Sequence, residues 1–490
     1  MRPGSWAVFE PIFQPRPLQW VLGAWLLLLL LCWPRERRAW WVFGAAAVVR
    51  LLTWSPRNHM HGDKIWSLLN GTVGLQSTNL QYGEAWPSLA MMAGWLSGWH
   101  MDTVHGLAAV LSAVTPVWLY VAVHRATGDA RAALGAGLLL AVLPLPVVMA
   151  PTETPMVLVG LLQVMAVAGA LGEHRRDAWL AALSVGLLAH CRPEQVAIAG
   201  MLWLLLLWQR RWWPAVAAAG LFVWRGAEFV ELQRRYGDIP GGSKTELLGQ
   251  FFSDLSLHVG PGARWGFTDP TLLPVGVLLL ALIGAAGPWK QRAGWALPLL
   301  AVAGGAIYWT QNLRPDQVRF HLPGQAWWAA LGAVGFARLY SVDRRLGAVA
   351  VLLAALSFNT ALTPRNPAWP WTVEYDFLRA QARLVPEGAT VRYARGFDQL
   401  PHFHQWAGRH LSGDWMPIEL VDGTPEPDAW VALLLVPTGT PDPDLSGRPL
   451  AAEVRFDAVW DNMAYRPTND GPTRIAIYGP VEGAARGGGE

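Results

Sequence analysis

Carboxylates suited to proton transfer stand at the ends of apolar runs in this sequence. Asp63 is the first acidic residue after an early run, and Glu153 lies in the turn Pro151-Thr152-Glu153-Thr154-Pro155. A carboxylate placed in this way can accept the proton of an attacking hydroxyl group. Each has a simpler explanation as well, because acidic residues favour helix starts and both precede segments with helical character.

Cationic side chains occupy similar positions. The candidates are Lys64, Arg192, Arg314 and Arg319. Cations of this kind can stabilise the negative charge that develops on a departing phosphate group. Two alternatives stay open: Arg192 could simply pair with Glu194, two residues further on, and Arg319 could be an anchor at the membrane interface.

Other polar residues near these positions could contact a sugar or an acceptor, namely His61, Tyr82, Glu84 and Glu194. The pattern His59-x-His61-x-Asp63 also contains residue types that bind metals. Alternate residues of an extended loop point to one side, so a divalent metal site is geometrically feasible there. Exposed loop histidines are much commoner, so we predict no cofactor and keep the metal as the alternative.

The chain that carries these residues is too apolar for one soluble globule. It has 490 residues, of which 53% are hydrophobic and 15% charged, and its mean hydropathy is +0.25. Soluble domains carry about 25% charged residues. The apolar residues form long uncharged runs, which predicts a polytopic α-helical membrane protein and excludes a disordered chain. The net charge is only +3 and the basic residues are scattered, which argues against a nucleic-acid partner.

We predict about twelve spans, each close to the length that a helix needs to cross a bilayer. They lie near 18–33, 39–54, 103–123, 132–150, 154–171, 178–190, 195–208, 213–229, 272–287, 293–310, 322–339 and 346–360. The first run lacks the basic segment and the cleavage site of a signal peptide. The sequence therefore predicts one membrane domain over residues 1–364.

Every second loop between these spans is short and carries at least two basic residues. By the positive-inside rule these loops face the cytoplasm. The outer loops then include 55–102 and 230–271, and the first of these should hold two helices that lie in the membrane interface. The Arg-rich, Lys-poor composition indicates a bacterial genome, so we expect a multi-pass protein of the inner (cytoplasmic) membrane. Cys32 and Cys191 fall at opposite faces and should not pair.

The tail, residues 365–490, changes character because charged and turn-forming residues return. We expect a small soluble α/β domain on the outer, periplasmic side, with a disordered Gly-rich end. A helix is predicted at 374–384, and strands are predicted at 390–394, 429–436, 452–456 and 474–478.

The order of these motifs resembles the GT-C glycosyltransferases. It comprises an acid after an early span, a Tyr-Gly-x-x-x-Pro-Ser-Leu-like stretch at 82–89, a Thr-Glu turn, an Arg-Pro-Glu at 192–194 and an Arg-Phe-x-Leu-Pro at 319–323. The sequence is most similar to the bacterial branch that includes relatives of protein O-mannosyltransferases and lipid A aminoarabinose transferases. The resemblance covers roughly residues 39–345. The family usually carries a second acid where Lys64 follows Asp63.

The resemblance implies transfer of a sugar from a polyprenyl-phosphate carrier to an acceptor hydroxyl on the outer face of the membrane. Asp63 would be the general base, with Glu153 orienting the acceptor or sharing that role. The four cations named above would bind the donor phosphate, and a single displacement would invert the anomeric centre. The acceptor could be a lipid, a glycan or a protein.

Two other classes of function compete with this one. A multispan transporter or lipid flippase would also have about twelve spans, but transporters place polar groups at the membrane midplane. The mid-span positions here read as almost wholly apolar, and no repeat relates the two halves. A non-catalytic scaffold would leave the outward carboxylates and arginines unexplained.

Overall fold

The structure is a computed structural model that describes two parts of the chain. In the helical part it describes residues 17–53, 83–97, 101–150, 152, 154–236, 273–287, 294–311 and 318–357. In the tail it describes residues 377, 381, 384–386, 389, 391–394, 418–420, 425–437, 439, 444–456, 459–461, 466–468 and 473–481.

The helical part confirms that the apolar runs form helices, because each predicted run coincides with helical structure. The helices are α1 (Pro17–Leu31), α2 (Arg37–Leu52), α5 (Ala85–Ser97), α6 (Met101–Thr127), α7 (Ala130–Val142), α8 (Pro144–Met149), α9 (Met156–Ala170), α10 (Arg175–Ala189), α11 (Val196–Trp208), α12 (Trp212–Tyr236), α15 (Val275–Ala285), α16 (Ala296–Gln311), α17 (Leu322–Val342) and α18 (Arg344–Leu356). Two short 3-10 helices, η1 (Pro193–Gln195) and η2 (Val318–His321), precede α11 and α17.

One predicted span is interrupted. The run 132–150 forms α7 and the short α8, with Leu143 in an extended conformation between them. The break has a local cause, because Pro144 cannot donate a backbone hydrogen bond and disfavours helical geometry in the residue before it. Proline is well suited to the first turn of the new helix, where its missing N–H group would have no partner in any case.

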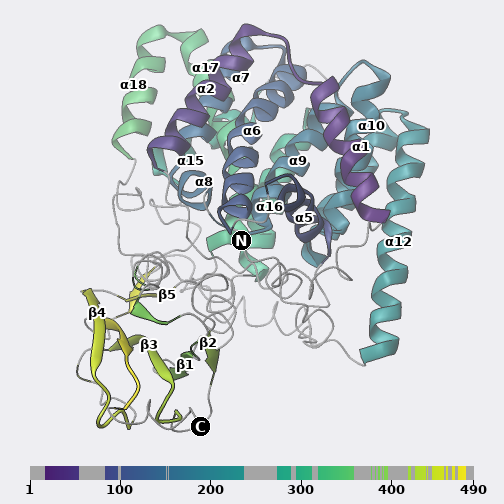
Figure 1. Ribbon diagram of the computed structural model, residues 1–490. Helices are drawn as coiled ribbons and strands as arrows, with labels where there is room; N and C mark the ends of the chain where they lie inside the picture. The colour runs from purple at the N-terminus through teal and green to yellow at the C-terminus, as the bar shows by residue number, and fades with distance from the viewer. Residues whose placement is uncertain are drawn as a thin grey trace.

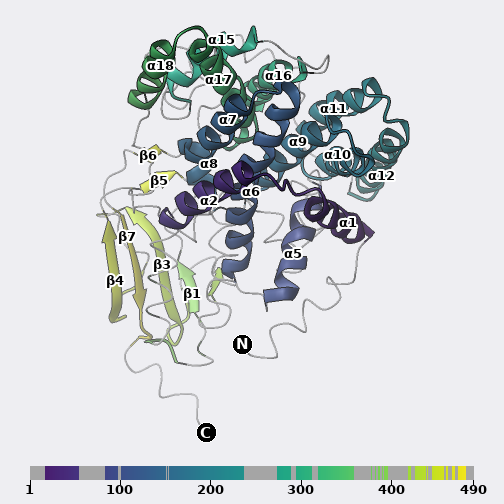
Figure 2. The same cartoon turned by 90° about the horizontal axis from the view of Figure 1, so that it is seen from above.

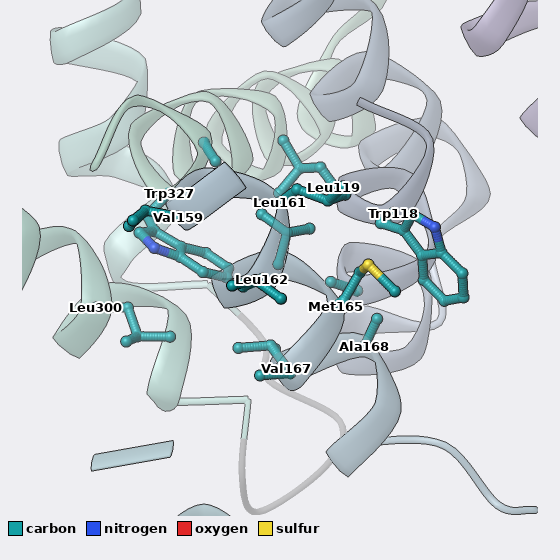
Figure 3. Close-up of a cluster of buried hydrophobic side chains, with 14 of the residues drawn as sticks. Trp118, Leu119, Val159, Leu161, Leu162, Met165, Val167, Ala168, Leu300 and Trp327 are labelled. Atoms are coloured by element: carbon teal, nitrogen blue, oxygen red, sulfur yellow. The ribbon is translucent and has the colours of Figure 1, made fainter. Parts of the chain in front are cut away.

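The centre of the helical part is built around α9. All its residues are buried, and α6, α10 and α17 pack against it (Figures 1 and 2). Figure 3 shows this core, with Trp118 and Met165 on one side and Trp327 beside Val159 and Leu162 on the other. A helix that is apolar on all sides is stable only where other helices surround it, as they do here.

Small residues let α15 and α17 approach closely. A Cβ atom on Gly335 would lie 1.9 Å from the Leu280 carbonyl oxygen, and one on Gly284 would lie 1.9 Å from that of Leu331. These distances leave no room for a side chain on either glycine. Close backbone packing through small residues is typical of helices that associate in membranes, where the hydrophobic effect does not drive them together.

The surface of the bundle is apolar in a way that suits lipid contact. Large exposed side chains occur on many helices, among them Trp20, Leu52, Trp213 and Leu356. Among the described helices, only Thr103–Thr127 is long and apolar enough to cross a membrane by itself, and several shorter apolar helices accompany it. The fold is therefore a mostly helical membrane bundle, and the full set of about twelve spans stays a prediction.

Four of the short loops that we predicted to be cytoplasmic lie at one end of this bundle. Arg125 forms an ion pair of 3.3 Å with Asp177, and Arg211 donates a hydrogen bond of 2.7 Å to the Gly172 carbonyl. The Tyr120 hydroxyl donates to the Glu36 carboxylate. These contacts join four connections of the same predicted side, so the alternation read from the sequence agrees with the arrangement of the helix ends.

The tail forms a small sheet with the strand order β2-β1-β3-β7-β4 (Figure 1). The strands are β1 (Val391–Ala394), β2 (Ile418–Leu420), β3 (Trp430–Pro437), β4 (Leu450–Phe456) and β7 (Thr473–Tyr478), with β5 (Val459–Asp461) and β6 (Arg466–Thr468) as a separate pair. β1 pairs in parallel with both β2 and β3, whereas β7 is antiparallel to β3 and β4. All four predicted strands are present, and β2, β5 and β6 were not predicted. The predicted helix 374–384 lies mostly outside the described residues.

Candidate functional site

Arg192 and Glu194 form a buried ion pair where α10 gives way to η1. The Arg192 Nε atom lies 2.8 Å from Glu194 Oε1, and the two side chains are 5% and 4% exposed. The Arg192 backbone is extended, and Pro193 starts the 3-10 helix that contains Glu194. The pairing that the sequence left open is therefore present, and the pair neutralises its own charge.

The same arginine connects this junction to the segment before α17. Its guanidinium carbon lies 5.2 Å from the centre of the Phe320 ring, within the range of a cation–π contact. Phe320 belongs to η2, so the contact joins two of the outer connections predicted to carry site residues. Arg319 is the neighbouring residue in η2, and the structure describes its backbone only.

A third outer connection packs on His190. The Ala85 backbone N–H donates a hydrogen bond of 2.9 Å to the His190 carbonyl, at the start of α5. A Cβ atom on Gly83 would lie 1.8 Å from that same carbonyl oxygen, so only glycine fits here. The close approach fixes the beginning of the Gly83-Glu84-Ala85 segment beside the Arg192 junction. Glu84 is half-buried within this segment.

Buried amides hold the Arg192 junction to the core helices. The Gln163 side chain in α9 donates a hydrogen bond of 2.8 Å to Gln195, and it accepts one of 3.0 Å from the Trp327 indole in α17. The three side chains are 3% or less exposed. Satisfied polar networks in an apolar interior favour one arrangement of the groups that they join, because the alternatives leave polar atoms unpaired. Gln163 and Gln195 were not predicted, although an amide inside an apolar run is a usable signal.

The turn before α9 is also buried. The Thr152 hydroxyl donates a hydrogen bond of 2.8 Å to the Met149 carbonyl, and the Thr154 hydroxyl accepts one of 3.4 Å from the Met156 N–H. The threonines thus close α8 and open α9. Glu153, which we predicted as a site residue or a helix cap, lies between them and outside the described residues.

His321 is fully buried at the start of α17. Burial lowers the pKa of its imidazole to about 3, because an ionised ring would lose its hydration. The ring is therefore neutral at physiological pH. Cys191, in the Arg192 junction, is buried too, and burial raises the pKa of its thiol, so this cysteine is unreactive. Cys32 and Cys191 are both free, in agreement with the prediction that they do not pair.

One arginine that was not predicted as a site residue is buried inside the bundle. Arg50, in the last turn of α2, is 4% exposed. Its Nε atom donates a hydrogen bond of 3.2 Å to the Ser112 hydroxyl, and its Nη1 atom donates one to the Ala141 carbonyl. Arg50 is thus a buried charge near the end of the predicted span 39–54.

The structure brings together some of the predicted site residues and does not describe others. Glu84, Arg192, Glu194 and the backbone of Arg319 come from three connections that meet around His190 and Phe320. The other predicted site residues lie outside the described residues: His59, His61, Asp63, Lys64, Tyr82, Glu153 and Arg314. Their contacts with the described group stay predictions.

The described residues contain no cluster of three or more His, Cys, Asp or Glu side chains that could hold a metal ion. The predicted metal alternative at His59, His61 and Asp63 falls outside them. The arrangement that is described has two parts: a neutral ion pair under an aromatic ring, and a bundle with buried cationic and amide groups at the same end.

Comparison with solved structures identifies proteins with a similar fold. The chain is similar to ArnT from Cupriavidus metallidurans, solved with bound undecaprenyl phosphate, over 90% of its own length and 98% of the ArnT chain. The identity is 16% and the TM-score is 0.51. The archaeal oligosaccharyltransferase AglB from Archaeoglobus fulgidus is also found. Its apo form matches 78% of this chain and 64% of the AglB chain, at 13% identity and a TM-score of 0.44.

ArnT and AglB are GT-C glycosyltransferases that use polyprenyl-phosphate donors. The GT-C resemblance predicted from the sequence is thus confirmed as a likeness of fold, and the ArnT match carries that conclusion. No protein-family profile and no curated protein matches the chain.

Proposed function

We propose that this protein is a membrane glycosyltransferase that moves a sugar from a polyprenyl-phosphate donor to an acceptor hydroxyl. The observation that carries the proposal is the fold match to ArnT, which extends over nearly the whole of both chains. The meeting of three outer connections at Arg192 and Phe320 adds support, because the predicted site residues come from those connections.

In the proposed reaction the acceptor oxygen forms a bond to the anomeric carbon while the bond from that carbon to the phosphate oxygen breaks. Asp63 takes the hydroxyl proton, and the polyprenyl phosphate leaves with the bonding electrons. A single displacement inverts the anomeric configuration. Glu153 orients the acceptor, and Lys64, Arg314 and Arg319 stabilise the departing phosphate.

Arg192 has a different place in this proposal. Its guanidinium already pairs with Glu194 and covers Phe320, so it has little free charge for a phosphate. We therefore assign the pair to positioning the segment before α17, beside the sugar contacts proposed for His61, Tyr82 and Glu84. The donor sugar belongs to the hexoses or pentoses, and the acceptor is a lipid, glycan or protein.

We further propose that the reaction takes place at the outer face of a bacterial inner membrane, with about twelve spans and the tail on the same side. Nucleotide sugars are not available there, so a lipid-borne donor suits that location. The cytoplasmic assignment of the opposite end follows from its arginine-rich loops.

The test is sugar transfer by the purified protein in vesicles that contain polyprenyl-phosphate-linked sugars. Asp63→Asn should lower turnover by roughly 10²- to 10⁴-fold, the usual contribution of a general base. Asp444→Asn removes an exposed tail carboxylate and should leave turnover unchanged. Full turnover by Asp63→Asn would remove Asp63 as the base.

A transporter is the second candidate, because Arg50 is a buried charge within a predicted span. Substrate flux into sealed vesicles, without any sugar transfer, would favour it over the enzyme.

A further inference from the structure

Arg50 is a buried cation whose hydrogen bonding is incomplete. Ser112 and Ala141 occupy its Nε and Nη1 atoms, but its Nη2 atom has no hydrogen-bond partner among the described residues. Both partners are neutral oxygens, and no described carboxylate forms an ion pair with this guanidinium. Its positive charge is therefore not balanced by the described part of the protein.

A buried charge that is not balanced by a partner is costly. Arg50 lies 13 residues after the start of α2, in the last turn of the helix, and its side chain is only 4% exposed. Charged side chains persist in such places only when a partner or a ligand compensates them.

A small cavity adjoins the arginine. It measures about 20 Å³, and a cavity needs roughly 10–15 Å³ to hold one water-sized group. Arg50, Ser112 and Thr115 supply its polar lining, and the remaining walls are mostly apolar. The Ser112 hydroxyl accepts a hydrogen bond from Arg50 and donates one of 3.2 Å to the Pro146 carbonyl. These two bonds fix the orientation of the hydroxyl.

Two helix starts line the same cavity. Met156 is the first residue of α9 and Leu322 is the first residue of α17, and both contribute to its wall. Helix N-termini carry partial positive charge, which favours an anion. Leu322 also follows His321 and Phe320 directly, so the cavity borders the segment that packs on Arg192.

We propose that Arg50 and this cavity bind a phosphate group, with one anionic oxygen seated against the guanidinium. The lipid-linked donor is the source, so this step rests on the proposed function. The cavity admits one oxygen atom of a phosphate, and the rest of the group lies outside it, towards the starts of α9 and α17. Arg50 thereby supplies the free charge that Arg192 lacks.

The experiment measures thermal unfolding of the purified full-length protein with added undecaprenyl phosphate, and with undecaprenol as the lipid without a phosphate. Undecaprenyl phosphate should raise the midpoint of the wild type, whereas undecaprenol should not. Arg50→Met should weaken the affinity for undecaprenyl phosphate by roughly ten- to a hundredfold, through the loss of a charge-assisted hydrogen bond. Arg50→Lys, which keeps the charge, should give an intermediate affinity.

Arg125→Met is the matched control. Arg125 also binds a backbone carbonyl and pairs with Asp177, but it lies at the opposite end of the bundle. The Arg125→Met variant should be less stable than the wild type, but undecaprenyl phosphate should still raise its unfolding midpoint. An equal shift in Arg50→Met and the wild type would overturn the proposal. The proposal would also be overturned if chloride or inorganic phosphate alone gave the whole Arg50-dependent shift of the unfolding midpoint, and the lipid added nothing to it.

The two proposals can fail separately. An Arg50-dependent shift in a protein that transfers no sugar would remove the enzyme and leave the phosphate site. Sugar transfer with normal donor affinity in Arg50→Lys and Arg50→Met would keep the enzyme and remove the site.

Discussion

Arg192 shows how a residue can be identified correctly as unusual and still have its role misjudged from sequence. An arginine beside a proline and a glutamate, at the end of an apolar run, suggests a cation free to bind phosphate. In the structure the arginine and Glu194 lie in contact at 2.8 Å and are both nearly inaccessible to solvent. A buried pair of this kind carries no net charge, so it positions the chain more effectively than it attracts an anion.

Removing one member of this pair should be worse than removing both. Arg192→Met leaves the Glu194 carboxylate buried and unpaired, which typically costs about 3–5 kcal/mol of unfolding free energy. Adding Glu194→Met to that variant removes the stranded charge, so the double variant should recover part of the loss. The measurement is a double-mutant cycle on thermal unfolding in detergent.

The pair Arg455–Glu453 in β4, which is more exposed than Arg192–Glu194, is the control for this cycle. Its arginine side chain is 63% exposed, and surface pairs contribute about 0–1 kcal/mol. The losses of unfolding free energy caused by the two substitutions there should be small and nearly additive. Additive losses at Arg192 and Glu194 as well would show that the buried pair is not coupled.

At the level of helices, the backbones of α15 and α17 lie in close contact at Gly284 and Gly335. Gly335→Ala should destabilise the protein, because the new Cβ atom would lie 1.9 Å from the Leu280 carbonyl and force the helices apart. The expected result is a lower unfolding midpoint, measured by thermal denaturation in detergent. Gly200→Ala in α11 is the control, since a Cβ atom there meets no atom within 4 Å. Equal midpoints for the two variants would contradict the packing.

The helices could be predicted well because long uncharged runs have few alternatives to helical structure in a membrane. The interruption at Leu143 was missed, although Pro144 signals it, because the apolar character continues through the break. β2, β5 and β6 were missed since three-residue strands are too short for an alternating pattern.

The site was harder to predict than the helices. Motif order located the Arg192 junction and the segment before α17, yet the pairing of Arg192 depends on which groups meet in space. Arg50 was missed because nothing in the sequence shows that Ser112 and Ala141 accept its hydrogen bonds. Tertiary contacts of this kind cannot be derived from local spacing.

The molecule as a whole divides its helix connections between two ends. Arg125, Asp177 and Arg211 join connections at one end, whereas His190, Arg192 and Phe320 join connections at the other. Each set contains only connections that are predicted to lie on the same side of the membrane. If the orientation of the protein were reversed, both sets would therefore change sides together. Orientation is thus one binary property of the entire bundle.

That orientation can be measured by labelling single cysteines with a membrane-impermeant maleimide. In a background where Cys32 and Cys191 are replaced by alanine, Glu173→Cys marks the arginine-rich end and Ser446→Cys marks the tail, and both positions are exposed. Because basic loops stay in the cytoplasm, Ser446→Cys should react in cells with a permeable outer envelope, and Glu173→Cys only after the inner membrane is opened. The reverse pattern would invert the proposed topology. If both cysteines react before the inner membrane is opened, or neither does, the tail lies on the same side as the arginine-rich end. That result would place the tail on the side opposite to the proposed sugar transfer.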